Sequence, residues 1–116
     1  MSGVFEGLNA MARVVWETAC SRGWHPGPPP INDIPRHLMN VHTEVSELWE
    51  AYRRGTLDAP SEHEGLNLSQ FEEELADIII RALDLGQMYG IDLKRAVGMK
   101  DQFNRQRPYR HGGKLA

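Results

Sequence analysis

The feature that most constrains this chain is a pair of long apolar stripes that repeat with the period of an α-helix. One stripe begins at Ile34 and continues through the segment 35–54, and the other runs through residues 69–89. Their members are Ile34, Leu38, Val41, Val45, Leu48, Trp49 and Tyr52 in the first, and Phe71, Leu75, Ile78, Ile79, Ala82, Leu85 and Tyr89 in the second. Spacings of three and four residues place the members of a stripe on one face of a helix. Both segments are therefore predicted to be helices that bury this face.

Four helices account for most of the chain, which predicts an all-α fold. The same periodicity covers residues 3–21, and a shorter helix is predicted over residues 93–105. The connections are the proline-rich segment 24–33, residues 56–68 and an extended tail, 106–116. A chain of 116 residues without an internal repeat fits one domain, a four-helix bundle over residues 1–116.

Capping residues mark several of the predicted helix ends. Ser69 is a predicted N-cap, and Glu72 completes a capping box with it. Asp33 and Asp92 are predicted N-caps of the second and fourth helices. Each cap gives a partner to backbone N–H groups that the first turn of a helix leaves unpaired, which supports the predicted boundaries.

The charged residues are segregated along the chain. The net charge is −3, yet seven of the thirteen Lys and Arg residues lie between Lys94 and Lys114. The acid-rich body before this stretch would repel nucleic acid and anionic membranes, so neither is an expected partner. A small phosphorylated ligand, held by metal ions on one side and by cations on the other, suits this distribution better.

Several classes of protein are excluded by features that the chain lacks. A run of about 18 apolar residues and a cleavable signal pattern are both missing, which predicts a cytoplasmic protein. Cys20 is the single cysteine, which excludes an internal disulfide and a cysteine-based metal site. P-loop chemistry and covalent catalysis are poor fits, because the chain has no Walker sequence and no evident Ser-His-Asp arrangement.

Two pairs of acids have matched spacing on the stripe-bearing helices. Glu44 and Glu47 lie three residues apart in the helix predicted over residues 35–54. Glu74 and Asp77 lie three residues apart in the helix predicted over residues 69–89. This spacing corresponds to about 60° around a helix, so each pair shares a face at the edge of its apolar stripe. Packing the two stripes together would bring the four carboxylates toward one another.

Converging carboxylates require a positive partner, and their chemistry indicates which one. Hard divalent ions prefer oxygen ligands, so this acid-only set favours Mg²⁺, with Mn²⁺ as the alternative. Zinc and carboxylate-bridged iron are disfavoured because no His or Cys stands at ligand spacing with the acids. Other acids on these helices point elsewhere by the same angular count and are interpreted as solvated charges: Glu50, Glu72, Glu73 and Asp84.

A polar, cationic face is predicted on the fourth helix and its extension. Lys100, Asn104 and Arg107 follow one another at i, i+4 and i+7, which places them on one side of a helix. A lysine, an amide and an arginine fork are the donors that a triphosphate needs beyond metal ions. The competing interpretation is a basic surface that balances the acidic body.

The order of these motifs resembles a known family. EVSE at residues 44–47, EELAD at residues 73–77 and KDQFNRQRPY at residues 100–109 are similar to the MazG-like, all-α nucleoside triphosphate pyrophosphohydrolases, particularly the small dCTP pyrophosphatase type. The similarity spans residues 22–110. It implies a helical homo-oligomer, a dimer or a dimer of dimers. It also implies Mg²⁺-dependent conversion of a (deoxy)nucleoside triphosphate to the monophosphate and pyrophosphate, as in nucleotide-pool control.

The resemblance also assigns roles to individual residues. It implies a catalytic set in which the acids bind the metal and two α-helical polar residues contact phosphates: Glu44, Glu47, Glu74, Asp77, Lys100 and Asn104. Arg107 and Tyr109 are further candidates for phosphate contacts. The candidates for the base pocket are Trp24, His25 and Trp49.

Packing is a competing interpretation for the aromatic residues. Trp49 lies on an apolar stripe, which favours a core position, and Trp24 at a helix end suits stacking and packing equally. The remaining histidines are interpreted as a core-edge residue, His42, and as surface residues, His37, His63 and His111. Two other functions stay open: a nucleotide- and metal-binding regulator without turnover, and a helical interaction protein whose acids are only solvated.

Overall fold

A computed structural model describes residues 3–25 and 31–116 of the chain. The elements in order are α1 (Leu8–Ser21), a 3-10 turn (Ile31–Asp33), α2 (Ile34–Arg53), α3 (Gln70–Met88), α4 (Leu93–Arg105) and the short α5 (Arg110–Gly113). Over the described residues the extended structure consists of one isolated bridge, between Pro60 and Ser69. The all-α prediction is confirmed. Residues 26–30 of the predicted proline-rich loop lie outside the described residues.

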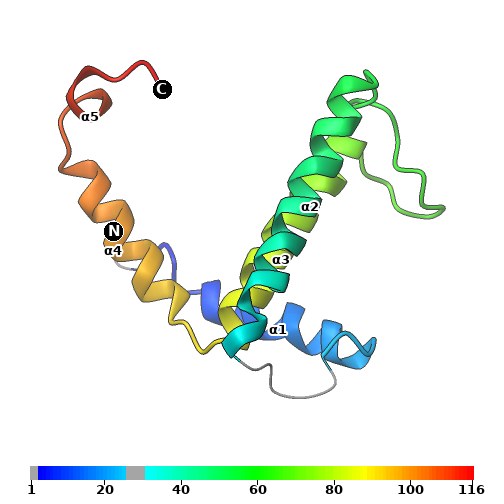
Figure 1. Cartoon of the computed structure of the whole chain (residues 1–116), viewed down its shortest axis with the longest axis horizontal. Coiled ribbons are helices and arrows are strands. Elements are labelled where there is room, and N and C mark those ends of the chain that lie inside the picture. The colour runs from blue at the N-terminus through cyan, green and yellow to red at the C-terminus, as the bar shows by residue number, and fades with distance from the viewer. Residues whose placement is uncertain (1–2, 26–30) are drawn as a thin grey trace.

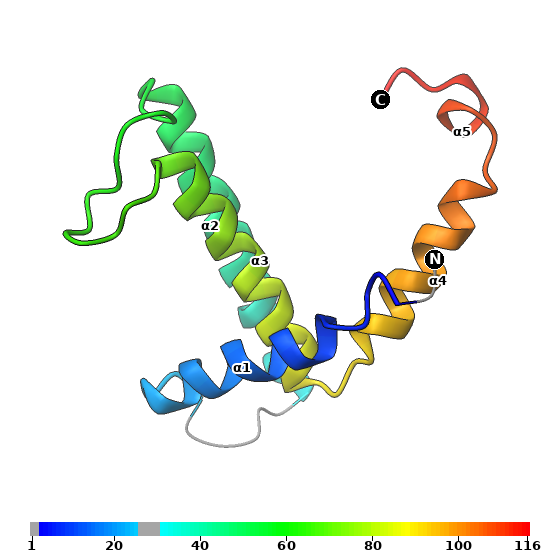
Figure 2. The ribbon, with the colours of Figure 1, turned by 180° about the vertical axis from the view of Figure 1, so that it is seen from behind.

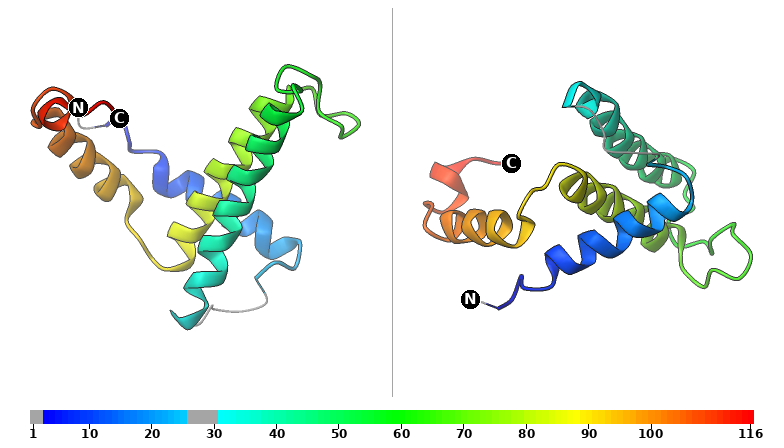
Figure 3. Two further views of the ribbon diagram at one scale, coloured as in Figure 1. Left: turned by 45° about the horizontal axis from the view of Figure 1, so that its top comes forward. Right: turned by 90° about the horizontal axis from the view of Figure 1, so that it is seen from below.

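The helices form an open V rather than a closed bundle within one chain. α2 and α3 lie side by side and run antiparallel, and α1 packs across α3 near its C-terminal end (Figures 1 and 2). α4 contacts α1 and then runs away from α2 and α3, which all views agree on (Figure 3). The radius of gyration is 16.7 Å, whereas a compact chain of this length has about 13 Å. The elements of the V are therefore only partly covered by their own chain.

The helix ends follow the capping chemistry in most places. The Ser69 hydroxyl accepts from the backbone N–H of Glu72, and the Glu72 carboxylate accepts from that of Ser69, so the predicted capping box is present. Asp92 caps α4 through the N–H of Arg95. Asp33 precedes α2 as predicted, but its side chain makes no capping hydrogen bond. Its carboxylate instead accepts from Arg36, a charged donor.

Two predicted boundaries change. α1 begins at Leu8 rather than residue 3, because Gly7 stands at its N-cap and offers no side-chain acceptor. The tail is not wholly extended, since α5 forms after Tyr109. The connection between α2 and α3 is tied back by backbone hydrogen bonds, including Ser61 N–H to Leu68 C=O and Gln70 N–H to Ala59 C=O. This holds the loop against the start of α3.

The apolar stripes are less buried than predicted. Among the described residues, the buried apolar side chains are those of Ala12, Ala51 and Leu83. Many stripe members remain exposed in the single chain: Leu38, Val45, Trp49, Tyr52, Phe71, Leu75 and Ile79. The reason is geometric, because α2 and α3 cover only part of each other's stripe. α4 meets α3 where Leu93 lies beside Gly86 and then runs away from both stripes (Figure 3). No described helix is both long and apolar enough to cross a membrane.

Candidate metal centre

Four carboxylates converge where the facing sides of α2 and α3 meet. Glu44 and Glu47 come from α2, and Glu74 and Asp77 come from α3. One carboxylate oxygen from each residue lies within 4.8 Å of the others. Ligands on opposite sides of a Mg²⁺ ion, at about 2.1 Å each, lie about 4.2 Å apart. The convergence expected from the spacing is present, and the cluster could hold a metal ion.

The cluster ranges from buried to exposed. Glu44 is 8% exposed, Glu74 and Asp77 are half-buried, and Glu47 lies on the exposed rim. Burial raises the pKa of Glu47, and the neighbouring charge of Glu44 adds to the effect. Burial, followed by the charges of Glu47 and Asp77, raises the pKa of Glu74 to about 7. Burial and the charge of Glu44 also raise the pKa of Asp77. Each of these carboxylates is thus harder to ionise beside the others.

Within the described part of the chain, a cationic side chain is hydrogen-bonded to the cluster. Arg81 Nε donates to Glu44 Oε1 at 3.1 Å. Glu74 Oε2, in contrast, is buried and has no hydrogen-bond partner among the described residues. A buried acceptor without a donor is costly. A divalent cation would satisfy this oxygen and the remaining negative charge, so the donor set fits a hard metal ion.

Cavities open on two sides of the acids. One of about 340 Å³ is lined by Glu44, Glu47, Asp77 and Arg81 and extends to Trp24 and Asp84. The second, of about 370 Å³, is lined by Thr43, Ser46, Glu47, Glu50, Arg54 and Glu74. Both offer space for a ligand next to the carboxylates.

The candidate base-pocket residues are placed differently from one another. Trp24 is 66% exposed and lines the first cavity. His25 Nε2 is hydrogen-bonded to Asp84 Oδ2 at 2.8 Å. Trp49 is 56% exposed, stacks on Tyr52 and is not among the residues lining these two cavities. Its expected core position is wrong for the single chain, in which more than half of its surface stays exposed.

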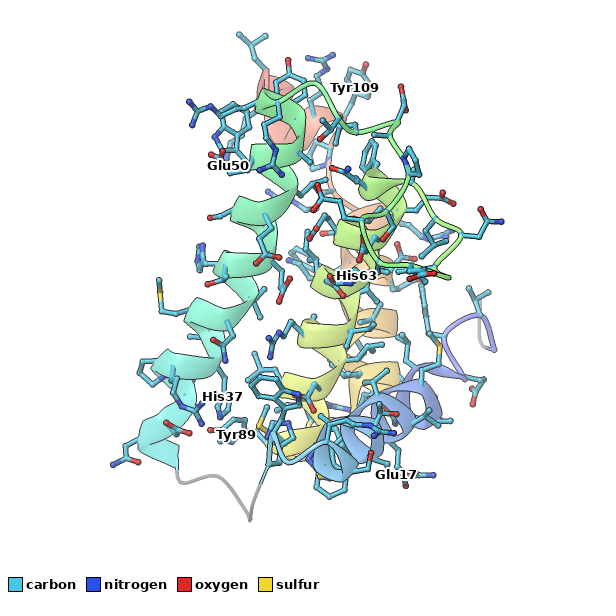
Figure 4. All side chains as sticks on the ribbon, turned by 90° about the vertical axis from the view of Figure 1, so that its right-hand side faces the viewer. Glu17, His37, Glu50, His63, Tyr89 and Tyr109 are labelled. Carbon is cyan, nitrogen blue, oxygen red and sulfur yellow. The ribbon has the colours of Figure 1, made fainter. Side chains whose placement is uncertain are left out.

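Two polar residues interpreted as solvated are buried. Asp84 is 5% exposed, and His37 is 5% exposed. The ring of His37 lies 6.1 Å from that of Tyr89, between the ends of α2 and α3 (Figure 4). The two corrections are linked through His25, which follows α1: it is hydrogen-bonded to Asp84, and its ring lies 6.1 Å from that of His37.

The other histidines differ in how well their predicted exposure agrees with the structure. His42 is exposed rather than at the core edge. His63 is exposed as expected and lies 3.2 Å from Glu73, an acid that is half-buried rather than solvated (Figure 4). The side chain of His111 lies outside the described residues.

The predicted phosphate-binding residues lie on the other arm of the V. Lys100 and Asn104 are on α4, and Arg107 and Tyr109 follow it. Lys100 Nζ lies 4.7 Å above the ring of Phe103, and Arg107 lies over the same ring. Within one chain the structure does not bring these residues to the acids (Figure 1).

Sequence analysis did not name Arg81, and it wrongly assigned Asp84 to another face of its helix. Both continue the spacing of the acids, since Asp77, Arg81 and Asp84 follow one another at i, i+4 and i+7. Extending the angular count along α3 would have placed them on the same face.

The comparisons with protein-family models, with curated proteins and with solved structures find no match to this chain. Its function is therefore inferred from the geometry of the site.

Proposed function

We propose that this chain is a Mg²⁺-dependent nucleoside triphosphate pyrophosphohydrolase, which releases pyrophosphate and a nucleoside monophosphate. The observation that carries the proposal is the convergence of four carboxylate oxygens within 4.8 Å beside two open cavities. When bound, Mg²⁺ supplies a Lewis acid that lowers the pKa of a bound water and neutralises phosphate charge. Glu44, Glu47, Glu74 and Asp77 would hold it.

The chain's own residues supply positioning and proton handling. Because the pKa of Glu74 is raised to about 7 before metal binding, Mg²⁺ binding near neutral pH would displace a proton from this carboxyl. Arg81 donates a hydrogen bond to Glu44 at the wall of the first cavity, where its guanidinium can also contact a phosphate oxygen. An anionic substrate with metal-binding oxygens is the class of ligand that matches both features.

We also propose that the active form is a homo-oligomer. The accessible surface is 8818 Å², about 2400 Å² more than a compact monomer of this mass exposes. Obligate interfaces bury about 2000 Å² or more. An apolar cavity of about 470 Å³, lined by residues such as Met11, Val14 and Ile79, lies on this uncovered surface. A second copy would cover it and could bring Lys100 and Asn104 to the partner's acids.

Size-exclusion chromatography with light scattering tests the assembly. The wild-type protein should elute as a dimer or tetramer, and Ile79→Glu should shift it toward the monomer by placing a charge in the apolar cavity. Leu115→Glu is the control, because Leu115 is 92% exposed at the chain end. A stable wild-type monomer would contradict the proposal.

A product assay tests the chemistry. Purified protein with Mg²⁺ should convert members of a panel of nucleoside triphosphates to monophosphate and pyrophosphate, and EDTA should stop the reaction. Glu47→Gln and Asp77→Asn should lower turnover by at least about 100-fold while circular dichroism stays unchanged, since each removes one proposed metal ligand. Glu17→Gln, on an exposed face of α1, should retain activity.

The product assay, together with measurements of nucleotide binding and of thermal stability, separates the rival functions. A regulator without turnover would bind a nucleotide with Mg²⁺ but release no pyrophosphate. A helical interaction protein with merely solvated acids would show no change of thermal stability on addition of Mg²⁺.

A further inference from the structure

A buried polar pair lies next to the acids and has no part in metal binding. His25 and Asp84 are hydrogen-bonded at 2.8 Å, and each side chain is only 8% exposed. The hydrogen bond from His25 uses Oδ2 of the Asp84 carboxyl. The other oxygen, Oδ1, is buried and has no hydrogen-bond partner among the described residues. Because a buried acceptor without a donor is unfavourable, this oxygen indicates a donor that comes from a ligand.

The position of Asp84 relates it to the metal centre. Asp84 lines the same 340 Å³ cavity as Glu44, Glu47 and Asp77. It lies seven residues after Asp77 on one face of α3, which corresponds to about 10 Å along the helix axis. This separation is comparable to that between the α-phosphate of a nucleotide and the far edge of its base. A ligand with its phosphates at the acids would reach Asp84 with its other end.

The walls of the cavity suit a flat ring. Val15, Ala19 and Ile80 contribute apolar surface, and Trp24 stands at the opening with a largely exposed indole. Aromatic faces of this kind stack on heterocycles and tolerate any base. Selection among bases therefore depends on the polar residues of the wall. Apart from the acids and Arg81 these are Thr18, Arg22 and Asp84, and of these three Asp84 is the buried one.

We propose that this cavity receives the nucleobase and that Asp84 Oδ1 accepts a hydrogen bond from an amino or ring N–H group on the base edge. This inference rests on the proposed function and adds to it a specificity-determining residue outside the metal site. The favoured ligands are bases that present an N–H donor there, and a base whose amino group is fully methylated is disfavoured.

Equilibrium binding tests the inference without turnover. The probes are non-hydrolysable α,β-methylene triphosphates of adenosine, cytidine and guanosine with Mg²⁺, each compared with the analogue whose exocyclic amino group is dimethylated. Wild-type protein should bind its preferred parent base about tenfold to hundredfold more tightly than the dimethylated form. Asp84→Leu should lose this preference, because leucine has a similar size but offers no acceptor to the base. Glu17→Gln should keep it.

The outcomes separate the inference from the proposed function. If the wild-type protein binds the triphosphates but treats parent and dimethylated bases alike, Asp84 holds only a water, and the inference is overturned while nucleotide binding stands. The same conclusion follows if Asp84→Leu, folded by circular dichroism, retains the preference. If no triphosphate binds at all, the proposed function fails together with the inference. The wild-type comparison needs no variant, so a misfolded Asp84→Leu would leave the test intact.

Discussion

Replacing Glu74 by glutamine should change how the stability of the metal-free protein depends on pH. The pKa of Glu74 is raised from its ordinary 4.5 to about 7, chiefly by burial and then by the charges of Glu47 and Asp77. Between these two pH values the folded protein holds a proton that the unfolded chain has released. The stability is therefore fully present below about pH 4.5 and falls as the pH rises through 7.

The size of the effect follows from the pKa values. A difference of about 2.5 in pKa corresponds to about 3 kcal/mol, at about 1.4 kcal/mol per pH unit. Because the Glu74 side chain is partly solvated, we expect about 2 kcal/mol of this to appear as lost stability between pH 5 and pH 8. Glutamine has no charge to lose, so Glu74→Gln should abolish this part of the pH dependence and be the more stable protein at pH 8.

Urea denaturation in EDTA at fixed protein concentration measures the free energy of unfolding at each pH. Glu17→Gln should keep the wild-type slope, because its carboxylate is exposed and outside the cluster. Adding Mg²⁺ at about 100 times its dissociation constant should restore about 2.7 kcal/mol to the wild type at pH 8 and less to Glu74→Gln. A variant that loses as much stability as the wild type between pH 5 and pH 8 would refute the electrostatic reasoning.

Two further predictions concern the helices that position the site. Ser69→Ala should cost about 1 kcal/mol in urea denaturation, because it removes the cap that accepts from Glu72 N–H; an unchanged midpoint would contradict it. Gly86→Ala should destabilise by about 1–3 kcal/mol, since a Cβ there would lie 2.6 Å from Leu93 Cδ1. Gly98→Ala is its matched control: the nearest atom would lie at 3.7 Å, so the better helix propensity of alanine should leave stability equal or higher. Equal losses at both glycines would argue against the close contact.

Much of the candidate site could be predicted because it depends on local geometry. The spacing of Glu44 with Glu47, and of Glu74 with Asp77, places each pair on one side of its helix wherever that helix lies. The amphipathic stripes then favour the packing of α2 against α3, which brings the pairs together. The cap at Ser69 is similarly local, because its hydrogen bonds join residues three apart.

The burial of single polar residues could not be predicted in this way. Asp84 and His37 have the spacing of ordinary helix residues, and both were expected to be solvated. α1 packs on α3, and His25 after it contacts both residues, through a hydrogen bond to Asp84 and a ring contact with His37; these long-range contacts have no local pattern. Whether a residue is buried depends on which distant segment covers it, and helical periodicity carries no information about that segment.

The sequence by itself determined the helical class, most helix boundaries and the pairing of acids on common faces, because these depend on interactions within a few residues along the chain. Only the tertiary structure decided that most of α4 extends away from α2 and α3 and that much of the apolar stripes stays uncovered. It also decided that Asp84 lines the cavity and has one buried oxygen without a hydrogen-bond partner among the described residues. The physical reason is that packing is set by contacts between distant segments, whose free energies depend on the shape and charge of both surfaces.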